Sequence, residues 1–212
     1  MIWILAAAQF AMPVPRDLPD VRAVFSPDDM PAYVQMAGIT RFVRTRTIVG
    51  PDGMPQGCTV EWASGDPYLD AYTCAIIVKR GRFEPAKWID GSAAYAVLRV
   101  PVTWAIGGAP SESQVQKAYP PDVTLAVTRL PAGAGKHVEV SLEIAVDESG
   151  KIVSCNQWLP AFKHFRPKTF PELLPIACQQ MTSKFTVEPA KDAYGKPIRS
   201  VQNASVLFTT DE

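Results

Sequence analysis

The chain has 212 residues, enough for one large domain or two small ones, and 47% of them are hydrophobic, which excludes a disordered tail. Lys and Arg together number 21, and Asp and Glu together also number 21. The positive and negative charges therefore balance, and they do so in each half of the chain. Neither half carries the basic excess that attracts nucleic acid or anionic lipid, so we expect no nucleic-acid partner.

The N-terminal segment is apolar from Ile2 to Ala11 except for Gln9. A membrane-spanning helix takes about 20 apolar residues, and neither this stretch nor any other is that long, so we expect no transmembrane anchor. Ala6 and Ala8 have the small-x-small spacing of a signal-peptidase site. Residues 1–11 are therefore predicted to be an export signal, with a buried N-terminal strand as the alternative.

Residues 24–107 begin with a predicted β-hairpin. The β-branched run 41–49 forms its first strand, and the return strand carries Cys58. Between them lies the turn 51–53, where Gly53 is free to adopt a positive φ.

A helix and a third strand complete this first region. Asp66 is a good N-cap, Pro67 suits the first helical position, and Gly81 ends the helix. The third strand runs from about Tyr95 to Ala105. Pro101 lies inside it and cannot donate to a neighbouring strand, which favours an edge strand over a central one.

Residues 119–212 predict the same order of elements after a linker at 108–118. Val138–Val146 alternates apolar and polar side chains as a half-buried strand does, and the return strand carries Cys155. The helix is expected at Thr169–Met181, with Pro175 shortening or kinking its first turn, and the last strand at Arg199–Phe208.

The two regions share their spacings. Gly53 precedes Cys58 by the same interval as Gly150 precedes Cys155, and from Cys74 and from Cys178 onward the Pro, Gly and aromatic positions also match. The spacing inside each cysteine pair differs by seven residues, which places an insertion in the stretch LPAFKHFRPKTFPE. The sequence therefore predicts a tandem duplication.

The four cysteines form two matched pairs, Cys58 with Cys74 and Cys155 with Cys178. In each copy one cysteine lies on the return strand and the other on the helix, so a disulfide would pin the helix to the sheet. For a loop of about 15 residues such a bridge contributes roughly 3 kcal/mol. Redox-active thiols and a metal site formed with His164 are the alternatives, and we expect neither a metal nor another cofactor.

A set of positions in the first copy forms a recognisable pattern: Asp52, Gly53, Cys58, Ser64, Gly65, Leu69, Asp70, Thr73, Cys74, Arg82, Phe83, Pro85, Ala86 and Gly91. The second copy keeps part of it: Gly150, Cys155, Ala177, Cys178, Pro189, Ala190 and Gly195. With this pattern the first copy resembles the cysteine-bearing branch of the TonB C-terminal domain family. The resemblance covers about residues 25–107, and the second copy matches more weakly.

The resemblance implies an α+β fold of two tandem domains, 24–107 and 119–212, each a three-stranded antiparallel sheet with a helix on one face. It also implies a periplasmic protein that binds an extended peptide of an outer-membrane transporter as an added strand along its last strand. The edges concerned are about Ala96–Thr103 and Arg199–Val206. The candidate binding residues are Val97, Arg99, Pro101, Val102, Thr103, Val201 and Asn203.

An energy transducer of this family needs a membrane anchor and a Pro-rich spacer, and this sequence shows neither. We therefore expect an exported relative that binds an envelope protein or a transporter peptide and is linked in this way to TonB-dependent transport. The alternative is a structural or assembly protein of the envelope that uses the same fold to associate with itself.

We expect no enzymatic activity. Asp66 and Asp70 have helical i, i+4 spacing, but a helix start favours both carboxylates without any catalytic role. Ser64 and Ser92 have no histidine nearby in the sequence. Other candidate partner-binding features are the basic runs KRGR and KHFRPK and the tryptophans Trp62, Trp88 and Trp158.

Overall fold

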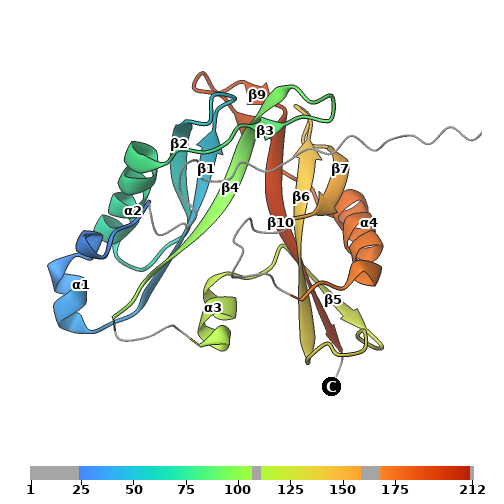
Figure 1. The fold of residues 1–212 in the computed structure, drawn as a ribbon, viewed down its shortest axis with the longest axis horizontal. Helices are drawn as coiled ribbons and strands as arrows, with labels where there is room; N and C mark the ends of the chain where they lie inside the picture. Colours follow the sequence, from blue (N-terminus) through green and yellow to red (C-terminus); the bar gives the residue numbers. More distant parts are fainter. Residues whose placement is uncertain (1–23, 107–110, 159–167, 211–212) are drawn as a thin grey trace, which may run out of the picture.

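The computed structural model describes residues 24–106, 111–158 and 168–210. These residues form a mixed β-sheet with four α-helices, which confirms the α+β class (Figure 1). The predicted export signal and most of the predicted seven-residue insertion lie outside the described residues. Among the helices of the described ranges, none is long and apolar enough to cross a membrane.

The first unit has the predicted order of elements. It consists of β1 (Arg41–Val49), β2 (Pro55–Trp62), α2 (Pro67–Arg80) and β4 (Ala93–Trp104), with the short β3 (Ala86–Lys87) pairing with the start of β4. Asp66 caps α2 as expected, because its carboxylate accepts from the main-chain nitrogens of Tyr68 and Leu69 at 3.0 and 3.2 Å. Gly53 has a φ of 78° in the hairpin turn, which a glycine adopts without strain.

Two short elements precede this unit and are not predicted from the sequence. They are the 3₁₀ turn η2 (Pro27–Asp29) and the helix α1 (Ala32–Ala37). Ser26 and Asp29 form a capping box at η2, a local signal that the sequence does contain. Both elements lie beside α2 at the lower left of Figure 1.

The second unit repeats the order with β6 (His137–Val146), β7 (Ile152–Gln157), α4 (Leu174–Lys184) and β10 (Ser200–Thr210). The predicted helix start at Thr169 is too early. A 3₁₀ turn, η3 (Pro171–Leu173), comes first, and Pro175 lies in the first turn of α4, where its missing N–H costs no helical hydrogen bond. A small hairpin of β8 (Ala190–Lys191) and β9 (Pro197–Ile198) precedes β10.

The segment between the units contains two elements that the sequence does not predict. The helix α3 (Glu112–Ala118), whose capping box joins Ser111 and Gln114, lies in the predicted linker 108–118, and the strand β5 (Val123–Val127) lies at the start of the region predicted as the second domain. The Gly, Pro and Ser content of this segment predicts a linker, whereas the capping box at Ser111 is the local signal for α3.

The sheet order is β2-β1-β4-β10-β6-β7, so the two expected three-stranded sheets are joined into one. The last strands make the junction: Tyr95, Ala96 and Val97 of β4 pair in parallel with Ser200, Val201 and Gln202 of β10. The pairs β1–β2, β1–β4, β6–β10 and β6–β7 are antiparallel, and β5 pairs in parallel with the end of β10. The separate sheets of the prediction are therefore corrected to one mixed sheet.

The two long helices cover opposite faces of this sheet. The helix α2 packs on the face of Val102 and Trp104, and α4 packs on the face of Val206 and Phe208. Ala96 shares the face of Val102, because strand side chains alternate, and its partner Val201 is on the opposite face from Val206. Two units with parallel last strands and opposed helices are related by an approximate twofold axis that runs along the strands.

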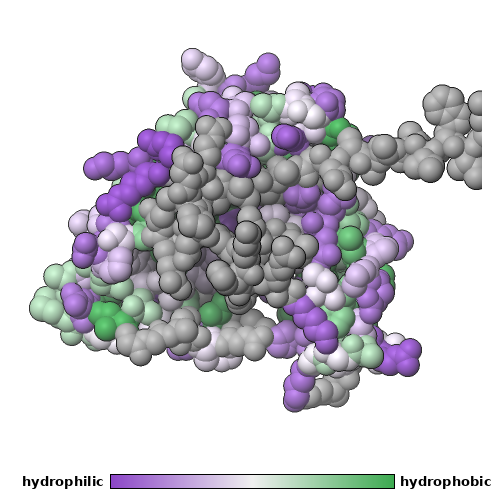
Figure 2. Space-filling model, viewed as in Figure 1, coloured by the Kyte–Doolittle hydropathy of each residue, from purple (hydrophilic) through white to green (hydrophobic). Residues whose placement is uncertain are grey.

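A core between the units buries this junction. It contains Ala96 and Leu98 of the first unit with Ala145 and Val201 of the second, and Trp158 packs against it. Exposed apolar side chains gather elsewhere, at the lower left of Figure 2 over α1 and the end of β4. They are Tyr33, Met36, Ile39 and Ile106.

Both predicted disulfides are confirmed. Cys58 of β2 is bonded to Cys74 of α2, and Cys155 of β7 is bonded to Cys178 of α4, with Cα–Cα distances of 5.5 and 5.7 Å. No described cysteine is free. Two structural disulfides indicate an oxidising compartment.

Candidate binding site

The last strand of the first unit changes its neighbour halfway along its length. From Tyr95 to Val97, β4 is paired with β10, and after Val97 the two strands diverge. At Arg99 the side chain of Asn203 replaces a strand neighbour: its Oδ1 accepts from the main-chain nitrogen of Arg99 at 2.8 Å, and its Nδ2 donates to the carbonyl at 3.3 Å. From Pro101 to Trp104 the described residues provide no strand partner on this side of β4.

The position of Pro101 has a physical reason. The N–H and C=O of Arg99 point towards β10, so residues 101 and 103 direct their main-chain groups to the same side. Pro101 offers no N–H there and so leaves no unsatisfied donor where β10 departs. The prediction of an edge strand therefore describes the C-terminal part of β4, whereas its N-terminal part is a central strand between β1 and β10.

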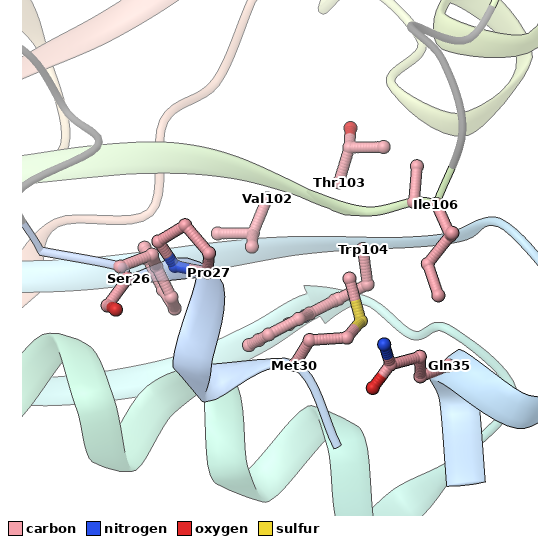
Figure 3. Close-up of a pocket in the computed structure, with 10 residues that line it drawn as sticks. Ser26, Pro27, Met30, Gln35, Val102, Thr103, Trp104 and Ile106 are labelled. Carbon is pink, nitrogen blue, oxygen red and sulfur yellow. The ribbon is translucent and has the colours of Figure 1, made fainter. Parts of the chain in front are cut away.

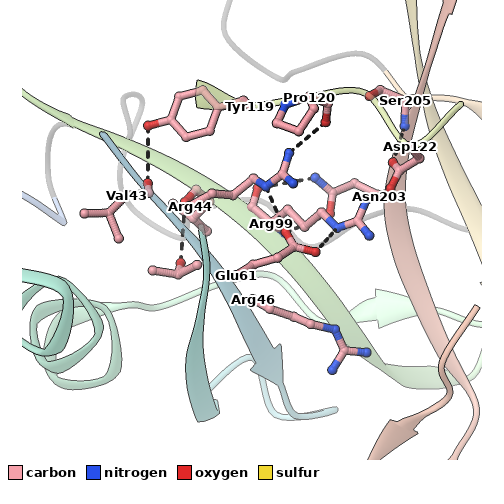
Figure 4. Close-up of polar contacts among 12 residues, drawn as sticks. Val43, Arg44, Arg46, Glu61, Arg99, Tyr119, Pro120, Asp122, Asn203 and Ser205 are labelled. Carbon is pink, nitrogen blue, oxygen red and sulfur yellow. Dashed lines mark hydrogen bonds and ion pairs between the residues drawn. The ribbon is translucent and has the colours of Figure 1, made fainter. Parts of the chain in front are cut away.

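A polar network fills the angle between the diverging strands (Figure 4). Arg99 forms ion pairs with Asp122 and, at 3.1 Å, with Glu61. Arg44 contacts the same Glu61 at 2.9 Å and donates to the carbonyl of Pro120 at 3.0 Å. The carboxylate of Asp122 also accepts from the nitrogen of Ser205 at 2.8 Å, so this network connects both units and the segment between them.

Tyr119 lies next to this network, on the face of the sheet opposite α2. Its hydroxyl lies 2.9 Å from the carbonyl oxygen of Val102 and 3.3 Å from that of Val43, so the two carbonyls share its proton. Its ring packs edge-on against Phe42. Burial raises the pKa of Tyr119 to about 12, so this hydroxyl keeps its proton and remains a donor at neutral pH.

The candidate binding residues from the sequence are brought to one place, but most of them are occupied within the chain. Val97 pairs with Gln202, Val201 pairs with Ala96, and Asn203 holds Arg99. Farther along β10, the edge from Val206 to Thr210 pairs in parallel with β5. The expected open edge at Arg199–Val206 is therefore covered, and the open stretch is Pro101–Trp104, which includes the candidates Pro101, Val102 and Thr103.

A groove of about 590 Å³ lies beside this open stretch (Figure 3). Its floor is Trp104, against which Phe25 packs edge-on with ring centroids 5.6 Å apart. Its walls come from η2, α1 and the end of β4, and include Met30, Gln35 and Ile106. These wall residues are not predicted from the sequence, since only the capping box at Ser26 signals a turn there.

The walls of the groove are fixed to α2 by two polar contacts. Arg80 binds the buried Asp29 with its two terminal guanidinium nitrogens, at 2.6 and 2.9 Å, which lowers the pKa of that carboxyl. The hydroxyl of Tyr33 donates to Asp66 at 2.6 Å, and partial desolvation of this hydroxyl together with the carboxylate raises the pKa of Tyr33 to about 12. The cap of α2 thus also positions α1.

The remaining candidates have structural surroundings. Asp70 accepts from the nitrogen of Ser64 at 2.8 Å, next to the Asp66 cap. Trp88 is buried under the guanidinium of Arg199, and Trp62 is 40% exposed. Most of the KHFRPK run lies outside the described residues, and the part of the chain that is described contains no cluster of His, Cys, Asp and Glu able to hold a metal ion.

Comparison of the chain with known protein families, with curated proteins and with solved structures finds no match.

Proposed function

We propose that the protein is a non-enzymatic binding module of the periplasm, resembling the TonB C-terminal domain, that holds an extended segment of an envelope protein as an added strand. The two disulfides support export, because they need an oxidising compartment. The order strand, strand, helix, strand in each unit is the one that the resemblance implies. An outer-membrane transporter is the partner that this resemblance favours.

One observation carries the proposal: each last strand already accepts another strand in parallel. β4 accepts β10 over three residues, and β10 accepts β5 over five. Both are additions within the chain to the edge that the resemblance assigns to the partner. A segment of the partner would add to β4 where this pairing stops, along Pro101–Trp104, with main-chain hydrogen bonds supplying much of the affinity.

The test is capture from an envelope extract by the full, oxidised chain. Thr103→Pro removes the N–H that points to the open edge, and Pro101 shows that the strand tolerates proline on this side. Thr103→Val keeps that N–H and serves as the matched control. We expect a partner that binds the wild type and Thr103→Val and is lost with Thr103→Pro; equal capture by all three would place binding elsewhere. Val97 is unsuitable for this test because it is 2% exposed and pairs with β10.

The second candidate function is a structural or assembly role in the envelope. The covering of β10, and of β4 as far as Arg99, within the chain favours it, since a partner then has little main chain to bind. Sedimentation of the purified chain distinguishes this role. A concentration-dependent dimer with no peptide capture supports assembly, and a monomer that captures a partner supports strand addition.

A further inference from the structure

The groove at Trp104 lies where an added strand would place every second side chain. Val102 and Trp104 point to the α2 side of β4, and Figure 3 shows Trp104 facing Met30 and Gln35 across the opening. A strand beside Pro101–Trp104 would alternate its side chains between this side and the side of Tyr119. Those on the α2 side would stand over the indole ring.

The lining of the groove is mainly apolar and carries no charge. None of the ten residues that line it carries a charge. The indole N–H of Trp104 donates to Thr73 at 3.0 Å, so the ring offers carbon to the groove. Ile106 is 43% exposed at one lip, and the amide of Gln35, for which the described residues provide no partner, lies at the other. A charged side chain would lose its hydration here without gaining an ion pair.

We infer that this groove is a specificity pocket for one large, uncharged, apolar side chain, such as Phe, Leu, Met or Trp, of an extended peptide paired with β4. This inference rests on the proposed strand addition. The volume of about 590 Å³ is ample for an aromatic side chain. Main-chain pairing alone selects no sequence, so the groove would supply the selectivity of the site.

The experiment uses random octapeptides displayed on phage and the full, oxidised chain as bait. We expect the selected peptides to share one position enriched in large apolar residues. In a synthetic peptide made from the selected sequence, alanine at that position should weaken binding by roughly 10- to 100-fold, as expected for an apolar side chain that returns to water.

Variants of the groove provide the second measurement. Ile106→Asp places a charge at the lip and should abolish the preference for a large apolar residue. Val78→Asp is the matched control, because Val78 is also 43% exposed but lies on the outer side of α2, away from the groove. Circular dichroism and the melting temperature show that both variants are folded.

The outcomes separate the inference from the function on which it rests. One outcome contradicts the pocket but supports strand addition. In it, Thr103→Pro no longer binds the selected peptides, but these peptides share no apolar position and bind Ile106→Asp as they bind the wild type. Peptides with the apolar position that bind Thr103→Pro unchanged keep the pocket and overturn strand addition. If the wild type selects no peptide, both are wrong.

Discussion

The side chain of Asn203 binds both main-chain groups of Arg99, accepting at 2.8 Å and donating at 3.3 Å. An amide side chain has the same donor and acceptor as a peptide group, so one residue of β10 continues the pairing where the backbones have separated. The guanidinium of the same Arg99 binds Glu61 and Asp122. The junction between the units thus depends on few residues.

Replacing Asn203 with Ala should lower the free energy of unfolding by about 1–2 kcal/mol, since two hydrogen bonds are lost at a half-buried site. Urea unfolding at neutral pH measures this change. Asn156→Ala is the control, because Asn156 is also half-buried and its side chain has no partner among the described residues. Equal stability of the two variants would show that the amide does not hold the junction.

Removing either disulfide should cost about 3 kcal/mol. The loops close over 16 and 23 residues, and loop entropy grows only with the logarithm of length, so the two costs should agree within roughly 0.5 kcal/mol. The paired variants Cys58→Ser with Cys74→Ser, and Cys155→Ser with Cys178→Ser, test this by guanidinium unfolding. A loss below about 1 kcal/mol in either pair would mean that helix packing alone fixes that unit.

Local signals explain why much of the fold is predictable. Asp66, Pro67 and Gly81 mark the ends of α2 within a few residues, and the alternation from Val138 to Val146 marks β6. The cysteine pairs follow from matched spacings alone. Each of these features depends on side chains close together in the sequence.

The pairing of β4 with β10 has no such signal, because hydrogen bonds between backbones leave no pattern in side chains. Pro101 is a partial clue that correctly indicates an edge but not that the edge begins there. The strand β5 has five half-exposed or exposed residues, and its alternation is too short to separate it from a loop. The groove at Trp104 needs η2 and α1 in place and is visible only in three dimensions.

Replacing Asp122 with Ala should loosen β5 without unfolding the sheet. The carboxylate bonds to Arg99 and to the nitrogen of Ser205 immediately before β5 joins β10, and a hydrogen bond to a charged group is among the stronger kinds. Amide hydrogen exchange of residues 123–127 should become about tenfold faster, while that of β6 stays unchanged.

The control for this exchange experiment is Glu139→Ala, an exposed carboxylate on β6. It removes a charge from the same unit without touching β5. Faster exchange over both strands in the Asp122 variant would mean that the second unit opens as a whole, contrary to a separable β5.

The ion pair of Asp29 with Arg80 predicts a stability difference that depends on pH. Hydrogen bonds from Arg80 lower the pKa of Asp29 below its ordinary value of 3.8 in the folded chain. Its contribution is therefore present above about pH 4 and is lost as the pH falls through the lower, folded-state pKa. Asp29→Asn should cost about 1–2 kcal/mol at pH 7, and this gap should narrow as the pH falls below about 4.

Thermal unfolding of the wild type and of Asp29→Asn between pH 2 and 8 measures this gap. Asp28→Asn is the control, because Asp28 is exposed, lies in the same 3₁₀ turn and has no ion pair among the described contacts. A gap that stays the same at every pH would assign the loss to packing and not to charge. Because Asp29 fixes η2 against α2, the same variant should also weaken selection for a large apolar residue at the Trp104 groove, whereas Asp28→Asn should not.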